Sequence, residues 1–271
     1  MLKFLLLIIT SQLILFAYSD YDLDGVEDAN DRCPNTPFTE LVDTYGCTIS
    51  STKSLHNFDF IYGISYTDSD YSGENTKTTS HNFQFDYYYK NFSLELSTGY
   101  FDSSSVSYND NGNDDSFVGV YYQFVPLKNL KIKTGIGFII PTFDSDLDNN
   151  NIDNTAIFSM SYGIKDLNFF VGYNFTKVND DNINTTELIV NYQDTHSYSL
   201  GVGFYPMQEV YFSTSYFISD SVYSTDEKVQ TISAYAFYSI SPNWFTTLSY
   251  ANGLSDSAND NYMSLRVGYN F

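Results

Sequence analysis

Apolar and polar residues alternate along most of the chain. From Phe58 onward, stretches of about ten to thirteen residues place an aromatic or aliphatic side chain at every second position, with small or polar residues between them. A period of two is typical of a β-strand with one apolar and one wet face. The pattern predicts twelve strands, over residues 58–67, 79–89, 92–101, 116–125, 130–142, 154–164, 167–178, 195–205, 209–220, 228–240, 244–254 and 261–271.

The connections between these strands alternate in length. Short ones fall at 90–91, 126–128, 165–166, 206–208 and 241–243, and long ones rich in Asp, Asn and Ser fall at 68–78, 102–115, 143–153, 179–194, 221–227 and 255–260. Short turns at one end and long polar loops at the other are the pattern of a bacterial outer-membrane β-barrel. The segment Ile183–Tyr192 also alternates, so it either extends the eighth strand beyond the membrane or raises the strand count to fourteen.

Residues that face one another across the short turns have matching polarity. The apolar pairs expected to share a face are Ile164/Leu167, Tyr162/Phe169, Met160/Val171, Phe158/Tyr173, Tyr89/Phe92, Tyr87/Leu94, Phe85/Leu96, Phe204/Val210 and Val202/Phe212. Cross-strand neighbours must share a face, so this agreement supports antiparallel pairing. A soluble β-sandwich would bury its apolar faces against each other and would have loops of similar length at both ends. We therefore expect an all-β fold, a transmembrane antiparallel up-and-down β-barrel over residues 56–271.

Composition excludes several other classes. The chain has 271 residues, a formal net charge of −21, and 18% aromatic residues. A disordered acidic chain would be poor in aromatic residues, and twelve basic residues among thirty-three acidic ones give no basic face for nucleic acid. A helical membrane protein would carry several apolar runs, whereas this sequence has one, at its start.

That first run predicts an export signal. Lys3 precedes an apolar stretch from Phe4 to Tyr18, and Ala17-Tyr18-Ser19 places small residues where signal peptidase cleaves, so residues 1–19 are expected to be a signal peptide rather than an uncleaved anchor. Export carries the chain to an oxidising compartment. Cys33 and Cys47, the two cysteines of the sequence, are therefore expected to form a disulfide.

Residues 20–37 carry carboxylates at a spacing that suits a hard cation. Because they alternate with other residues, Asp20, Asp22 and Asp24 turn toward the inside of one tight loop. Gly25 permits the sharp turn of that loop, and the backbone carbonyl of Val26 adds an oxygen ligand. The candidate calcium ligands are Asp20, Asp22, Asp24, Val26, Asp28 and Asp31. The alternative is an acidic solvated linker, and an EF-hand does not fit because the twelfth loop position holds no Glu.

This stretch resembles a thrombospondin type 3 repeat, D-x-D-x-D-G-x-x-D-x-x-D-x-C-P, which it matches at every defining position. Its continuation, Asn35-Thr36-Pro37 and Val42-Asp43-x-x-Gly46-Cys47, is similar to the version in outer-membrane proteins of the OmpA/OprF kind. The resemblance implies a calcium-binding segment over residues 20–50.

The C-terminal Phe271, preceded by alternating apolar residues, resembles the signal by which outer-membrane barrels are recognised by their assembly machinery. This resemblance implies that both termini are periplasmic, with the calcium segment ahead of the first strand. The acidic loops would then face outward, where divalent cations bridge lipopolysaccharide. The expected partners are outer-membrane lipid, lipopolysaccharide and the assembly machinery.

The predicted lumen face is mostly small and polar. Its members include Gly63, Ser65, Ser93, Ser97, Gly99, Gly135, Gly137, Ser161, Gly163, Gly172, Gly201 and Gly203. The lumen charges are Asp59, Asp86 and Glu95 against Lys131, Lys133 and Arg266. Strand parity places Asp86 opposite Glu95, with Arg266 or a lysine across the lumen as their expected partner. Such charges either stiffen a closed barrel through salt bridges or form a constriction that selects solutes.

Two functions remain open. The first is a passive channel for small solutes, in which lumenal glycines and serines leave room for a narrow water path. The alternative is a non-conducting structural or surface-interaction barrel of the cell envelope. Outer-membrane phospholipase A is also twelve-stranded, but its chemistry needs a His and a Ser on one face. Here Ser197 follows His196 on the opposite face, so no enzyme is expected.

Overall fold

The computed structural model describes residues 20, 22, 26, 28, 31–33, 36, 42, 45–47, 55–71, 74–107, 109–142, 151–184 and 189–271. It divides into two compact units, residues 1–52 and residues 53–271. The predicted signal peptide and the predicted ligand Asp24 lie outside the described residues. In the described part of the chain, no helix has the length and apolarity needed to cross a bilayer.

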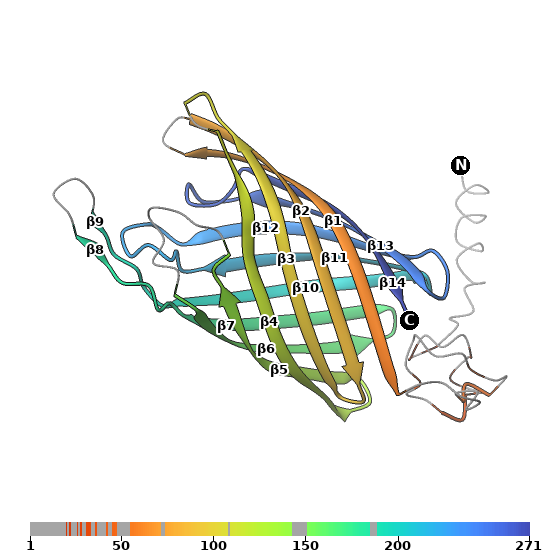
Figure 1. Ribbon diagram of the computed structural model, residues 1–271. Coiled ribbons are helices and arrows are strands. Elements are labelled where there is room, and N and C mark those ends of the chain that lie inside the picture. The colour runs from red at the N-terminus through yellow and green to blue at the C-terminus, as the bar shows by residue number, and fades with distance from the viewer. Residues whose placement is uncertain are drawn as a thin grey trace, which may run out of the picture. The chain divides into compact units, whose positions relative to one another are not determined.

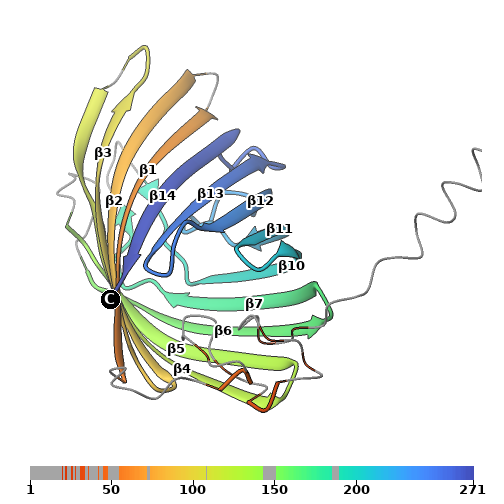
Figure 2. The same cartoon turned by 90° about the vertical axis from the view of Figure 1, so that its right-hand side faces the viewer.

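The larger unit is a closed antiparallel barrel of twelve strands, which confirms the predicted all-β barrel and its strand count (Figure 1). Its strands are β1 (His56–Tyr71), β2 (Glu74–Tyr89), β3 (Phe92–Ser104), β4 (Asn109–Leu127), β5 (Leu130–Ile140), β6 (Asp153–Ile164), β7 (Leu167–Lys177), β10 (Thr195–Met207), β11 (Val210–Ser219), β12 (Val229–Ser239), β13 (Trp244–Gly253) and β14 (Asn261–Asn270). Neighbours in sequence are neighbours in space, and β14 returns to pair with β1 and close the ring (Figure 2). We call the end with the short connections the turn end and the opposite end the loop end.

The apolar surface lies on the outside of the barrel. On β1, for example, Phe60, Tyr62, Ile64 and Tyr66 are all exposed. Among the described hydrophobic side chains, only Tyr121 and Ala258 are buried. This distribution is the reverse of a soluble domain and suits a wall in contact with lipid.

The predicted strand register is confirmed at two turns. Ile164 pairs with Leu167 around Lys165-Asp166, and Tyr89 pairs with Phe92 around Lys90-Asn91, with the remaining predicted pairs following in step. Lys90 and Lys165 open these turns with φ of 52° and 53°, in the left-handed region. The two strands of each hairpin therefore meet through a tight two-residue turn.

The predicted register is wrong at the third turn. Phe204 pairs with Phe212 rather than with Val210, and Val202 pairs with Thr214. A β-bulge between Phe204 and Met207 absorbs the difference, so that the turn falls at residues 208–209.

A second bulge of the same kind lies on β4, near the turn that joins it to its partner β5. Phe124 pairs with Ile132 and Leu127 pairs with Leu130, which leaves Val125 and Pro126 opposite one residue. Pro126 and Pro206 occupy equivalent places in the two bulges. Proline has no N–H to give to the ladder, so a bulge is where a strand can accept it.

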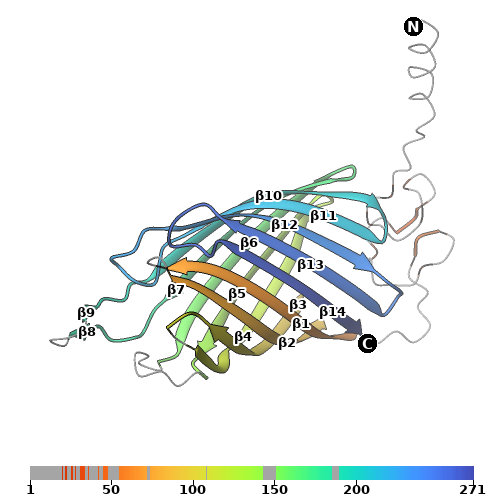
Figure 3. The same ribbon diagram turned by 90° about the horizontal axis from the view of Figure 1, so that it is seen from above.

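Several predicted loops are partly strands. β1 and β2 pair out to Tyr71 and Glu74, and β3 and β4 pair out to Ser104 and Asn109, so residues 68–71, 74–78, 102–104 and 109–115 extend the sheet at the loop end. The segment Ile183–Tyr192 fits neither predicted alternative. It contributes β8 (Ile183–Asn184) and β9 (Ile189–Val190), a separate two-stranded sheet that projects from the loop end (Figure 3).

Candidate functional site in the barrel lumen

Three carboxylates lie side by side on the inner wall. Asp59 on β1 pairs with Asp86 on β2, and Asp86 pairs with Glu95 on β3, as predicted for the second pair. Paired residues of antiparallel strands have Cα atoms about 5 Å apart. We call Asp59, Asp86 and Glu95 the acidic row.

The acidic row is held by neutral hydrogen-bond donors. Asn270 Nδ2 donates to Asp59 Oδ1 at 2.6 Å, Gln84 Nε2 donates to both oxygens of Asp86 at 3.0 and 2.9 Å, Tyr88 Oη donates to Asp86 Oδ2 at 3.3 Å, and Tyr121 Oη donates to Glu95 Oε2 at 3.1 Å. Such donors stabilise a carboxylate without cancelling its charge. The row therefore places three carboxylates, each held by neutral donors, side by side across three strands.

The lumen cations do not pair directly with this row. Arg266 donates to Gln84 Oε1, and Gln84 in turn donates to Asp86, so the expected link between Arg266 and Asp86 runs through an amide. Lys133 places its Nζ 3.9 Å from the centre of the Tyr121 ring. Lys131 is exposed and faces Ser161 on β6. Within the described ranges, the one ion pair closer than 4.0 Å joins Lys228 to Asp220, at the loop end.

Aromatic rings lie over several of the lumenal glycines, so these positions add less open space to the lumen than small residues alone would. The ring of Tyr121 lies over Gly135, that of Phe170 over Gly201, that of Tyr211 over Gly203 and that of Phe245 over Gly268. A Cβ atom at Gly135 would lie 2.6 Å from the backbone oxygen of Val120, closer than real Cβ atoms approach. Glycine is therefore required there by close packing against the neighbouring strand.

Sequence reasoning missed these inward aromatic residues. Tyr205 and Tyr211 have ring centres 4.5 Å apart, Tyr211 and Tyr235 are 6.3 Å apart, and Phe237 and Phe245 are 5.7 Å apart. Phe237 also pairs with Tyr211 across β11 and β12. We call Tyr205, Tyr211, Tyr235, Phe237 and Phe245 the aromatic strip. The sequence signal that could have revealed them is an aromatic residue at a lumen-facing position, next to a glycine on the neighbouring strand.

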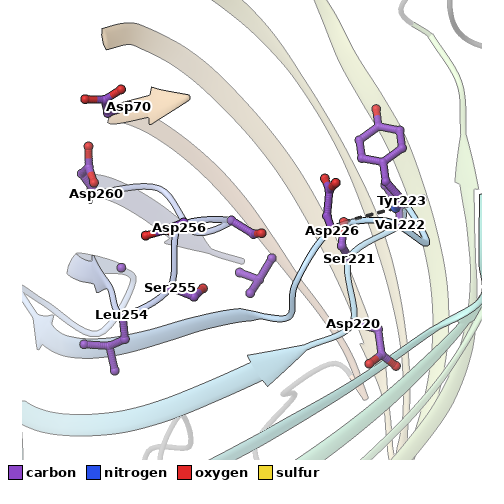
Figure 4. Close-up of a pocket in the computed structure, with 13 residues that line it drawn as sticks. Asp70, Asp220, Ser221, Val222, Tyr223, Asp226, Leu254, Ser255, Asp256 and Asp260 are labelled. Carbon is purple, nitrogen blue, oxygen red and sulfur yellow. Dashed lines mark hydrogen bonds between the residues drawn. The ribbon is translucent and has the colours of Figure 1, made fainter. Parts of the chain in front are cut away.

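A pocket of about 1080 Å³ lies at the loop end (Figure 4). Three segments surround it with aspartates: Asp70 on β1, Asp220 and Asp226 after β11, and Asp256 and Asp260 between β13 and β14. We call it the acidic pocket. Lys228 Nζ lies 2.8 Å from Asp220 Oδ1, and this hydrogen bond lowers the pKa of the Asp220 carboxyl.

The three histidines lie on the outer face of the barrel rather than in the lumen. The Nδ1 atoms of His56, His81 and His196 are hydrogen-bonded to the hydroxyls of Tyr87, Tyr62 and Tyr173, at 2.6, 2.7 and 2.9 Å. Such pairs suit the aromatic belts of a membrane barrel. They do not form the His–Ser arrangement that nucleophilic catalysis needs.

The smaller unit contains the predicted disulfide between Cys33 and Cys47, with Cα atoms 5.0 Å apart. Buried Thr36 lies inside the loop that the disulfide closes, where its hydroxyl donates to the backbone oxygen of Gly46 at 2.7 Å. Gly46 has a φ of 73°, a left-handed conformation that favours glycine.

Two of the predicted calcium ligands are directed toward the same turn. Asp22 Oδ2 accepts a hydrogen bond from the N–H of Thr36 at 2.6 Å, and Asp31 Oδ1 accepts one from the N–H of Cys33 at 2.7 Å. Asp31 Oδ2 is buried and has no hydrogen-bond partner, so this oxygen is free to coordinate a cation. Among the described side chains, however, no three carboxylates, imidazoles or thiolates gather closely enough to hold a metal ion.

The whole chain was compared with known proteins. No family model matches it, and no curated protein matches it. Among solved structures, it is similar to an outer membrane channel from Pseudomonas putida F1, with a TM-score of 0.68 and 8% identity over 82% of this chain and 98% of that one.

Two porins are also similar. The NanC porin has a TM-score of 0.52 and 13% identity, covering 78% of this chain and 98% of its own. The KdgM porin has a TM-score of 0.53 and 10% identity, covering 79% of this chain and 99% of its own. At these identities the likeness establishes the fold, so the chain has the architecture of an outer-membrane β-barrel of the channel and porin type.

Proposed function

We propose that this protein is an outer-membrane channel through which small solutes diffuse passively. The observation that carries the proposal is the inner wall, where the acidic row, Arg266 and Lys133 lie inside a closed barrel whose outer wall is apolar. A wall that only needed to be stable would gain little from such charges, because buried charges are costly to desolvate. Polar and charged lumens are typical of barrels that admit water.

The structural neighbours support the proposal. They are an outer membrane channel and two porins, and the KdgM porin has also been described in complex with a disordered oligogalacturonate. By this proposal the turn end faces the periplasm and the loop end faces the exterior, as in barrels with short periplasmic turns and longer outer loops. Both the N-terminal segment and the C-terminus would then be periplasmic.

A second function is favoured by one specific observation. Aromatic rings cover several of the lumenal glycines, as Tyr211 covers Gly203 and Phe170 covers Gly201, and these rings narrow the interior. A lumen filled in this way would make the protein a non-conducting structural barrel whose acidic loops act at the cell surface.

Conductance in planar lipid bilayers separates the two functions. The chain from residue 20 to 271 is refolded in detergent, shown to be closed by its heat-dependent migration in gels, and added to one side of the bilayer in 1 M KCl. Reproducible small current steps are expected from a channel. Silence from a folded barrel would contradict the channel and support the structural function.

The N-terminal segment is proposed to bind calcium through Asp20, Asp22, Asp24, Asp28 and Asp31 and the carbonyl of Val26. Support comes from the carboxylate spacing and from the buried Oδ2 of Asp31, since oxygen-rich loops of this kind suit Ca²⁺. Calorimetric titration of Ca²⁺ into the folded 20–271 chain tests it. Asp31→Asn is expected to weaken binding about tenfold or more, whereas Asp166→Asn, in a short turn of the barrel, leaves it unchanged. Absence of saturable binding by the unmodified chain would overturn the proposal.

A further inference from the structure

We propose that the lumen selects organic cations, that is, amines that carry an apolar or aromatic body. This inference rests on the proposed channel function and adds a substrate class to it. Four features of the structure point to the same chemistry: the charge of the acidic row, the placement of Lys133, the aromatic strip and the acidic pocket.

The acidic row presents negative charge that the protein does not neutralise by direct pairing. Its hydrogen-bond partners are Asn270, Gln84, Tyr88 and Tyr121, all uncharged. Arg266 is tied to the wall through its bond to Gln84. A cation in the lumen would therefore find carboxylates whose geometry is already fixed, which lowers the cost of binding it.

The lumen already contains one example of the proposed recognition. The ammonium group of Lys133 lies 3.9 Å from the centre of the Tyr121 ring, and the hydroxyl of that ring donates to Glu95. A ring face backed by a carboxylate thus holds a primary amine of the chain itself. Ammonium groups are attracted to aromatic faces by the ring quadrupole.

The aromatic strip offers further ring surface at the same end of the barrel. Tyr205 and Tyr211 flank the turn at 208–209, and Asp86 lies close to the turn at 90–91, so both features line the turn-end part of the lumen. Arg266 on β14 pairs with Gly63 on β1 and with Thr247 on β13, so it lies on the wall between the acidic row and the aromatic strip. An amine with an apolar body can contact carboxylates on one side and rings on the other.

The acidic pocket at the loop end is expected to concentrate cations at the entrance to the lumen. The acidic pocket carries five aspartates, and one of them, Asp220, is paired with Lys228. Clusters of one charge sign concentrate counter-ions of the opposite sign and raise their rate of entry. An anionic solute would be repelled by the same field, and the net charge of −21 adds to this repulsion within the screening length of the solution.

Bilayer recordings with matched probes test the inference. The probes are the phenethylammonium cation and the benzenesulfonate anion, which both carry a benzene ring. Reversal potentials in KCl gradients give the ion preference, and gradients of each probe give its relative permeability. The unmodified 20–271 chain is expected to prefer K⁺ over Cl⁻, and to pass phenethylammonium at least about tenfold better than benzenesulfonate.

Two double variants and one control double variant identify the residues responsible. Asp86→Asn with Glu95→Gln is expected to lower the cation preference severalfold, whereas the control Asp166→Asn with Glu209→Gln removes the same charge from the periplasmic turns and leaves the preference unchanged. Tyr211→Leu with Tyr235→Leu is expected to lower phenethylammonium permeability about two- to fivefold, without changing the K⁺/Cl⁻ ratio.

The outcomes separate the two proposals. A silent folded barrel refutes the channel and, with it, the selection of cations. Current without a preference for K⁺ or for phenethylammonium overturns only the selection, as does equal preference in the acidic-row variant and its control. If the acidic-row variant fails to form a closed barrel, the reversal potential of the unmodified chain still decides the sign.

Discussion

Replacement of Gly135 by alanine tests whether the lumen wall requires glycine. A Cβ atom at this position would lie 2.6 Å from the backbone oxygen of Val120 and 3.0 Å from Tyr121 Cε1. A side chain can rotate away from such a contact, but the backbone oxygen of a paired strand cannot. β4 and β5 must therefore separate locally, and Tyr121, whose Cδ1 would lie even closer to the new Cβ than that oxygen, must also move, so the substitution strains the wall.

The expected loss of stability is about 1–3 kcal/mol, the usual cost of overpacking a tight site. Displacement of Tyr121 would add the loss of its hydrogen bond to Glu95, about 1.5–3 kcal/mol for a bond to a charged group. The control is Gly172→Ala. There the nearest atom to a Cβ is the hydroxyl of Ser199, which can rotate, and the next lies at 3.8 Å. We expect the control to change stability by about 0.5 kcal/mol or less.

Urea unfolding in phospholipid vesicles measures both variants. Trp244 is the single tryptophan of the chain and lies exposed on the outer wall, so its fluorescence reports the transfer of the barrel from lipid to water. A Gly135→Ala barrel as stable as the unmodified one would refute the packing argument. So would equal losses at Gly135 and Gly172, because a general intolerance of alanine would explain them.

Three further predictions concern local features. Lys165→Gly should stabilise its hairpin by up to about 1 kcal/mol, because φ is positive there, and the same vesicle unfolding would show it. The lowered pKa of Asp220 means that its pairing with Lys228 stabilises the loop above about pH 4 and loses this effect as the pH falls below the ordinary Asp pKa of about 3.9. Hydrogen exchange of residues 220–228 should therefore gain relative protection above that pH, and Lys228→Met should abolish the gain. Thr36→Val leaves the buried Gly46 carbonyl without its donor, so trypsin should cleave after Arg32 about tenfold faster or more.

The outer wall was predictable because lipid demands an apolar side chain at every second position. That demand ends at the loop end of the barrel. Residues 74–78 are Glu-Asn-Thr-Lys-Thr, which carry no apolar face, yet they continue β2 in step with β1. Only backbone hydrogen bonds extend these strands here, and the pattern of apolar side chains therefore cannot predict this extension.

The bulges were harder to predict because they depend on one atom that proline lacks. The sequences Phe-Val-Pro-Leu at 124–127 and Phe-Tyr-Pro-Met at 204–207 share a pattern, and both form a bulge of two residues opposite one. The side-chain pattern predicts Pro126 and Pro206 in the short connections at 126–128 and 206–208, whereas both prolines lie in strands. The repeated spacing from Phe to the following apolar residue was the signal that could have corrected the register.

The lumen charges were predictable from parity, but their partners were not. Parity gives the face of a residue and says nothing of how far a long side chain reaches along the wall. Arg266 on β14 contacts Gln84 on β2, across the whole width of β1. Only the closed arrangement of strands brings these two side chains together.

The pairing of β1 with β14 has a consequence for how the barrel is made. Asp59 and Asn270, whose side chains are hydrogen-bonded across this seam, are 211 residues apart in the chain. Contacts of such sequence separation form late and slowly, because a large loop must be ordered before they stabilise anything. Until then β1 and β14 are open sheet edges, ready to pair with other chains. The final strand thus determines when the intermediate stops being prone to aggregation, and a chain truncated before β14 remains in that state.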